Sequence, residues 1–482
     1  MKKHRWLAFL AGLFLFAPLS VSCERETQPF CQYEIVAEYR PSSAVVTGSV
    51  KVTFENPTEN MLSDLRFNLY PNAYRENALF KAVSPDNYDA VYYRGASYGS
   101  ITVSSVVGGK SWQIEGEDEN VLAVYLEQPL APNERAVVDI AFMTKLPYAN
   151  HRLGITERTV NFGGVFPVLC GLQDGAFVEC AHTSLGDPFY ADCADYRVEF
   201  TLPKEYILAS SGACVEEKTL ESKTRHILTI ENARDFALVA SEDFNVEKMT
   251  AGKTSIEYYY VADETPRRTA EALKQAVEFF SARFGEYPYA RYTVAETGLS
   301  FGGMEYSAFA MLSLFSGENR VRSAVHETAH QWWYGAVGSN QLAEAWQDEG
   351  LAEYSAALFF DAHMEYGLTK QSVVADALGE YRSYYRSYAS SLGWADTRMS
   401  RPLREYLSEY EYRVLSYDKG VVMFDALESS IGSKRFLAAL KRYYAENRFS
   451  VATPANLVGA FERSGVDVAG FFDGFLNGKT TI

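Results

Sequence analysis

The sequence predicts two folded domains, a β-rich domain followed by an α+β domain. Two observations support this. The chain has 482 residues, of which 47% are hydrophobic and 22% charged, and single cores rarely grow beyond about 250 to 300 residues. Its hydrophobic pattern also changes at about residue 246, from strand-like alternation to helical periodicity. We therefore expect the boundary there.

The first domain is predicted to span residues 31–245. Segments such as "YEIVAEYR", "GSVKVTFEN" and "ADYRVEFTLP" alternate apolar and polar residues and are separated by Gly, Pro, Asn and Asp. No long helical pattern interrupts them. An all-β sandwich or saddle of antiparallel strands is the simplest architecture for such a series.

The second domain is predicted to span residues 246–482. It opens with a helix in which Thr265 is the N-cap, Pro266 the first helical residue and Gly285 the residue past the end. One strand-like segment follows at 293–312, and helical patterns continue to the C-terminus. Strands first and helices after them indicate an α+β domain.

The first 22 residues have the pattern of a signal peptide. Lys2, Lys3 and Arg5 precede an apolar run that is too short for a spanning helix with stop-transfer flanks. Cys23 then resembles a bacterial lipoprotein cysteine, with residues 23–30 as a linker. We expect an exported protein, anchored to the cell envelope by a lipid on Cys23 or otherwise secreted.

The charge balance excludes some partners. The 62 acidic and 45 basic residues give a net charge of -17, which repels phosphate backbones and anionic headgroups. Nucleic acid is therefore not expected, and a membrane only through Cys23. Disulfides and buried thiols both remain open for the other five cysteines, and the oligomeric state is unknown.

The stretch "HETAH" (326–330) has the spacing of a metal site. Residues four apart share one face of a helix, so His326 and His330 can bind one ion. Glu327 is rotated from that face by about 100°, which suits a general base better than a ligand. An isolated HExxH pattern is, however, equally consistent with an ordinary amphipathic helix.

The next helical segment, "EAWQDEGLAEY" (344–354), completes the pattern. Glu349 can supply the third protein ligand that a catalytic zinc ion needs. Glu353, four residues later, can accept a hydrogen bond from the second nitrogen of a ligand histidine. With an export signal and a separate glutamate helix, the sequence favours one Zn²⁺ per chain over a structural helix.

These segments resemble the gluzincin motif of the aminopeptidase N family, in which HExxH is followed after eighteen residues by the ligand glutamate. "GGMEY" (302–306) resembles the GxMEN motif of that family, and "YDKG" (417–420) resembles its YxKG stretch. The resemblance implies a thermolysin-like second domain and a zinc-dependent aminopeptidase, in a two-domain form that lacks the C-terminal helical domain.

The resemblance also implies residue roles. Glu327 would be the general base and Tyr417 the donor to the oxyanion, although the residues alone left Tyr406, Tyr410 and Tyr412 equally open. Glu305 would bind the α-ammonium of peptide substrates with a free N-terminus. The preceding residues would line the substrate backbone: Gly302, Gly303 and Met304.

The sequence also departs from the family pattern. Asp348 and Tyr306 each replace an Asn, and the residue that the β domain usually lends to amine binding has no clear counterpart, Glu179 being a candidate. Without the C-terminal domain we expect a more open cleft that admits longer peptides. The alternatives are an endopeptidase or epoxide hydrolase on the same zinc site, or a catalytically silent peptide-binding surface protein.

Overall fold

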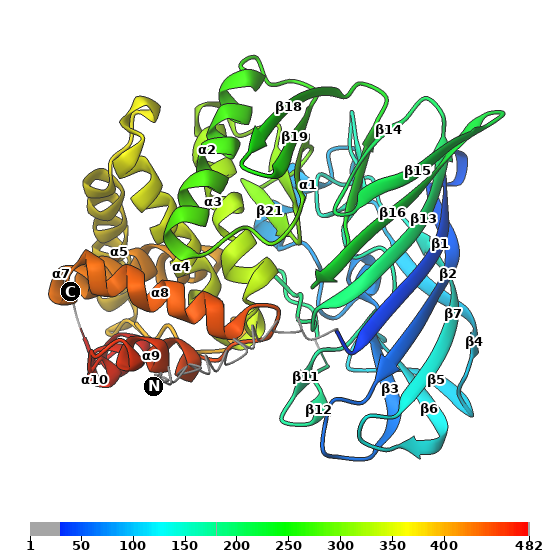
Figure 1. Cartoon of the computed structure of the whole chain (residues 1–482), viewed down its shortest axis with the longest axis horizontal. Coiled ribbons are helices and arrows are strands. Elements are labelled where there is room, and N and C mark those ends of the chain that lie inside the picture. The colour runs from blue at the N-terminus through cyan, green and yellow to red at the C-terminus, as the bar shows by residue number, and fades with distance from the viewer. Residues whose placement is uncertain (1–28, 180, 481–482) are drawn as a thin grey trace, which may run out of the picture.

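The computed structural model describes residues 29–179 and 181–480. The predicted signal peptide, Cys23 and most of the 23–30 linker lie outside these residues. A β domain and a helix-rich domain stand side by side (Figure 1). The chain therefore has the β-then-α+β order that the sequence predicts.

A seven-stranded sheet forms the main layer of the β domain. Its strands are ordered β15-β16-β13-β1-β2-β7-β4. The pair β1 and β13 is parallel and the others are antiparallel. Alternate residues of β1 are buried, as its alternating sequence requires. The strands span Ala213–Leu220, Lys223–Ala233, Ala194–Pro203, Cys31–Arg40, Val45–Glu55, Arg135–Lys145 and Ser100–Val107 in that order.

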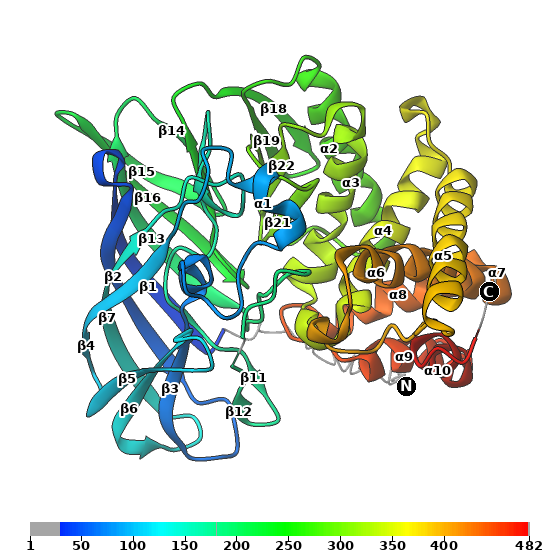
Figure 2. The same ribbon diagram turned by 180° about the vertical axis from the view of Figure 1, so that it is seen from behind.

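Smaller sheets complete the β domain. One has the order β10-β3-β6-β5 and comprises Val168–Leu169, Leu62–Asn68, Val121–Leu130 and Ser111–Glu115. Another has the order β14-β17-β9-β8 and comprises Ile207–Ser210, Leu238–Ser241, Val160–Phe162 and Leu153–Ile155. A hairpin joins β11 (Leu172–Gln173) to β12 (Ala176–Phe177). The one-turn helix α1 (Tyr88–Val91) reaches the second domain beside β21 (Figure 1, Figure 2).

The second domain begins with a five-stranded sheet of order β18-β19-β20-β22-β21. The predicted boundary at 245/246 falls at the start of β18 (Asn245–Ala251). The single strand-like segment expected at 293–312 instead contains three strands. The loop after β20 reverses the chain before β21, and Ala308, with φ of 56°, turns it again into β22. The remaining strands span Thr254–Tyr260, Arg291–Thr297, Gly303–Tyr306 and Phe309–Ser313.

Helices make up the rest of this domain. Helix α2 (Pro266–Phe284) begins and ends as the sequence predicts, between Thr265 and Gly285. None of the helices that the structure describes is long and apolar enough to cross a membrane. The other helices are α3 (Arg320–Ala329), α4 (Gln341–Ala362), α5 (Lys370–Leu392), α6 (Glu409–Arg413), α7 (Lys419–Ile431), α8 (Ser433–Asn447), α9 (Pro454–Arg463) and α10 (Ala469–Leu476).

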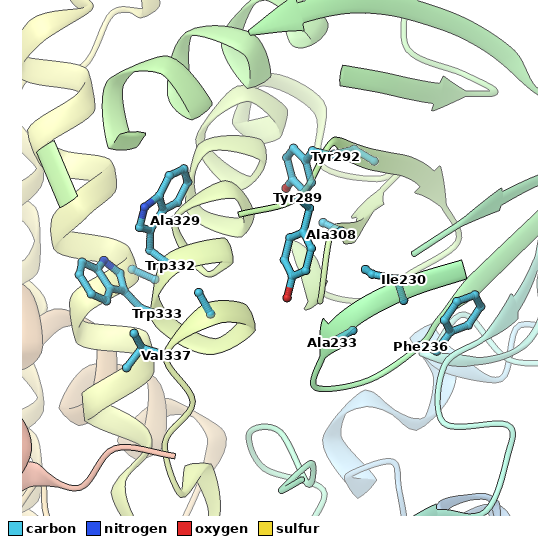
Figure 3. Close-up of a cluster of buried hydrophobic side chains, with 14 of the residues drawn as sticks. Ile230, Ala233, Phe236, Tyr289, Tyr292, Ala308, Ala329, Trp332, Trp333 and Val337 are labelled. Carbon is cyan, nitrogen blue, oxygen red and sulfur yellow. The ribbon is translucent and has the colours of Figure 1, made fainter. Parts of the chain in front are cut away.

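The two domains share one hydrophobic core. Figure 3 shows Ile230 and Phe236 of the β domain in the same buried cluster as Trp332 of the second domain. Buried Arg234 reinforces the junction, because its guanidinium donates to the carbonyl oxygens of Tyr334 at 2.9 Å and of Ala191 at 2.7 Å, one in each domain. The position of a β-domain side chain relative to the second domain is therefore fixed by packing.

Candidate active site

Three potential metal ligands converge at the junction of α3 and α4. His326 lies on α3, His330 directly follows it, and Glu349 lies on α4. The two histidine Nε2 atoms are 3.0 Å apart, and the Oε2 atom of Glu349 is 3.4 Å from one and 3.3 Å from the other. All three side chains are buried. They form a nearly equilateral triangle of donor atoms.

This triangle fits a zinc ion. The Nδ1 of His330 forms a hydrogen bond with Asp348 at 2.7 Å, and the Nδ1 of His326 lies 2.8 Å from Glu353. A carboxylate beside each Nδ1 favours the tautomer in which Nδ1 carries the hydrogen and Nε2 presents a lone pair. Three lone pairs then face one another. Tetrahedral zinc with bonds of about 2.0 Å has ligand atoms about 3.3 Å apart, which matches the observed spacing.

Glu327 has the position of a general base. It lies on α3 beside the triangle and is 5% exposed, and its Oε2 has no hydrogen-bond partner among the described residues. A Cβ at Gly303 would collide with its carboxylate, so this glycine allows β21 to approach α3. Burial raises the pKa of Glu327 to about 7, although His326 and His330 oppose the shift. Such a carboxylate can take up and release a proton near neutral pH.

Two tyrosines flank the triangle. The ring of Tyr417 stacks on that of His326, with centroids 5.7 Å apart, and the hydroxyl of Tyr412 donates to Glu349 at 3.3 Å. The segment that carries these tyrosines approaches the metal ligands because α4 and α7 are in close contact at Gly350 and Gly420. A Cβ on Gly420 would lie only 2.6 Å from the Cα of Gly350. Both tyrosines line a cavity beside the triangle, so their hydroxyls can reach a bound substrate.

The other two tyrosines that the sequence left open lie elsewhere. The hydroxyl of Tyr406 donates to the carbonyl oxygen of Met399 at 3.3 Å. Tyr410 is exposed at 37% and lines neither cavity of the site. Of the four tyrosines, Tyr412 and Tyr417 therefore lie beside the metal ligands, and Tyr412 donates a hydrogen bond to Glu349.

A pair of buried carboxylates adjoins the triangle. Glu305, on β21, is 3% exposed, and Asp187, from the loop after β12, is 7% exposed. The guanidinium of Arg152 forms an ion pair with Asp187. Burial raises the pKa of both carboxyl groups, and the negative charge of Asp187 raises the pKa of Glu305 further. A cation bound between them would relieve this repulsion.

The β-domain carboxylate that lines the cavity with Glu305 is Asp187 and not Glu179, the candidate from the sequence. Glu179 instead forms an ion pair with Arg66 on the β domain, and it does not line the cavity that contains Glu305. Sequence reasoning missed Asp187 because it lies in an irregular loop, where no periodicity or spacing relates it to the zinc motif. The fold alone brings it to Glu305.

Two cavities meet at the triangle. One, of about 130 Å³, is lined by Glu305 and Asp187, and the other, of about 330 Å³, extends past Arg322 and Arg413. Gly302 and Gly303 line these cavities, as the sequence predicts for substrate-binding residues. Met304 does not, because its side chain is 1% exposed and its Sδ lies 2.8 Å from Nε of Arg152.

The second domain is similar to a known family of peptidases. Residues 268–475 match the model of the peptidase family M1 domain. The second domain is therefore similar to the M1 peptidase domain over these residues. Among curated proteins, Aminopeptidase M1-C of Oryza sativa subsp. japonica is 26% identical over 217 residues, which are 44% of this chain and 23% of the rice protein. The chain therefore spans about a quarter of this relative.

Solved structures extend the M1 likeness to the whole fold. The M1 zinc metallopeptidase of Deinococcus radiodurans superposes with a TM-score of 0.66 at 18% identity, over 94% of this chain and 96% of that one. A mutant of that metallopeptidase, bound to a Tyr-Ser-Ala substrate, superposes with a TM-score of 0.65 at 18% identity, over 94% and 95%. The predicted two-domain fold is thus confirmed, and the family resemblance agrees with the match of residues 268–475.

Proposed function

We propose that this M1 protein is a zinc-dependent aminopeptidase that hydrolyses the first peptide bond of peptides with a free N-terminus. The position of Glu305 and Asp187 is the strongest support for this activity. They line the smaller cavity beside a triangle of zinc-ligating atoms. A fixed pair of carboxylates there favours an α-ammonium group and leaves little room for residues before it.

The metal would be held by His326, His330 and Glu349, one ion per chain. Bound there, zinc supplies a Lewis acid that lowers the pKa of water and polarises a carbonyl. Glu327 accepts the proton from the attacking water and returns it to the departing amine. Tyr417 donates its phenolic hydrogen to the oxygen on which negative charge develops.

The peptide direction follows from the two cavities. The amine end lies in the cavity of about 130 Å³ with Glu305, so the residues after the scissile bond extend into the cavity of about 330 Å³. An endopeptidase would need an open channel on both sides of the metal. A catalytically silent scaffold would have lost a ligand or the base, whereas His326, Glu327 and Glu349 are all present.

A substrate panel tests this function. Purified protein should cleave leucine and arginine p-nitroanilides, lose the activity to a chelator and regain it with stoichiometric zinc. N-acetylated versions of the same anilides should be cleaved far more slowly, because they lack the ammonium group. Equal cleavage of free and acetylated substrates would overturn the aminopeptidase proposal in favour of the endopeptidase alternative. Hydrolysis of an epoxide but no anilide would favour the epoxide hydrolase.

We further propose that the protein is exported and anchored by a lipid on Cys23. The proposal is supported by the basic and apolar leader and by small residues before that cysteine. Cells labelled with a fatty acid should incorporate it into the wild type but not into the Cys23→Ser variant. If both proteins remain unlabelled yet appear outside the cytoplasm, secretion without an anchor is the correct alternative.

A further inference from the structure

A buried amide connects the metal ligands to the amine-binding carboxylates. Gln341, the first residue of α4, is 2% exposed, and its Nε2 donates to Glu305 at 3.1 Å and also to Asp348. Asp348 in turn accepts from Nδ1 of His330 at 2.7 Å. One continuous series of hydrogen bonds therefore runs from a metal ligand to the residue that faces the substrate ammonium.

The charges around the amide fix its orientation. Both N–H groups of Gln341 point to carboxylates, while its Oε1 has no hydrogen-bond partner in the described part of the chain. The flipped amide would place its carbonyl oxygen against Glu305 and Asp348, where like partial charges repel. Two charge-assisted hydrogen bonds are worth more than the one bond that the oxygen lacks.

A neutral donor suits this position. Arg152 already lies in the same cavity and pairs with Asp187, so a lysine or arginine at position 341 would add a second cation that competes with the substrate ammonium for Glu305. An amide orients the carboxylate without neutralising it. Gln341 lines neither cavity of the site, so it acts through Glu305 and Asp348 rather than on the substrate.

We propose that Gln341 is a positioning residue for two subsites at once. Through Glu305 it aims the carboxylate that receives the substrate ammonium. Through Asp348 it supports the tautomer and orientation of His330 and thereby the affinity for zinc. The first effect rests on the proposed aminopeptidase function, whereas the second concerns metal binding alone.

The test compares Gln341→Met, which keeps the length and removes both donors, with the wild type. We expect KM for leucine p-nitroanilide to rise about tenfold while kcat changes less than about threefold, since hydrogen bonds to charged groups are lost. The zinc dissociation constant, measured by competition with a chelator, should rise about tenfold. Gln347→Met is the matched control, because Gln347 is buried on the same helix but bonds Tyr443 and Ala452.

Double variants trace each effect to its carboxylate. In a Glu305→Gln background, Gln341→Met should no longer change KM, and in an Asp348→Asn background it should no longer change zinc affinity. Undiminished effects in those backgrounds, or a Gln347→Met variant with the same losses, would overturn the positioning role. If the wild type lacks aminopeptidase activity, the proposed function fails, and the zinc measurements still decide whether Gln341 acts on His330.

Discussion

The metal triangle and the carboxylate pair of Glu305 and Asp187 line the same cavity but are assembled differently. The triangle comes from α3 and α4, which follow each other in the chain, and two of its ligands are spaced by one helical turn. The carboxylate pair combines Glu305 of the second domain with Asp187 of the β domain. The first subsite depends on local helix geometry, and the second depends on how the domains dock.

The two subsites should therefore respond to different perturbations. The metal ligands are supported within the second domain, by Glu353 and Asp348. Asp187 is held by Arg152 of its own domain, and the docking that brings both to Glu305 depends on Arg234 and the shared core. Changes in the β domain should therefore alter substrate binding and leave zinc in place.

Replacing Glu327, the proposed proton acceptor beside the metal ligands, should cause the greatest loss of activity. Glu327→Gln should lower kcat by about 10²- to 10⁴-fold, because the amide neither accepts nor returns the proton. The bound zinc, counted by atomic absorption, should stay at one per chain, since Glu327 is not a ligand. Full activity in this variant would exclude Glu327 as the base.

The oxyanion donor should give the next largest effect. Tyr417→Phe should reduce kcat by about 10²- to 10³-fold with little change in KM, as expected when a donor acts only in the transition state. Steady-state kinetics on leucine p-nitroanilide measures this. Tyr410→Phe is the control, because this exposed tyrosine lines neither cavity. A larger loss in Tyr412→Phe than in Tyr417→Phe would exchange their assigned roles.

Asp187→Asn tests the carboxylate pair. We expect kcat/KM for aminoacyl anilides to fall about 10- to 100-fold, mostly through KM, because one charge-assisted contact to the ammonium is weakened. Zinc content should not change. Glu179→Gln, at the β-domain carboxylate that pairs with Arg66, should behave as the wild type. Loss of zinc in Asp187→Asn would show that the two subsites are not separable.

The smallest effect concerns the support of the segment that carries Tyr417. Lys419 is buried and donates to the carbonyl oxygens of Thr397 and Phe475, the latter at 2.8 Å. Burial lowers its pKa from 10.5 to about 7, although Asp396 opposes the shift. Between these values the unfolded chain binds a proton that the native protein lacks, so the free energy of unfolding should rise with pH, by at most about 1.4 kcal/mol per unit.

Urea unfolding between about pH 7.5 and 9.5 measures this slope, since that window lies between the two pKa values. Lys419→Met should remove this dependence of the free energy of unfolding on pH. Lys434→Met should leave it unchanged, because Lys434 is exposed at the start of α8. Zinc content and KM should be the same in both variants. A change of KM in Lys419→Met would mean that this support also shapes the substrate site.

Tertiary contacts altered several expectations from the sequence. The segment 293–312 is a strand followed by a hairpin, because Ala308 adopts a left-handed conformation. An alanine at this position does not predict such a conformation. Met304 belongs to a motif yet points away from the cavity, because alternate residues of β21 face opposite sides of the sheet. Asp187 and Gln341 entered the site only through docking and packing.

The order of the domains, the spacing of the metal ligands and the placement of Glu327 beside them follow from the sequence alone. These depend on periodicities of a few residues, which any helix or strand must obey. Tertiary contacts set which carboxylate accompanies Glu305, which tyrosines face the metal ligands and how Gln341 links the two subsites. Those contacts join segments distant in the chain, and their geometry is set by how the two domains and their helices pack rather than by any local pattern.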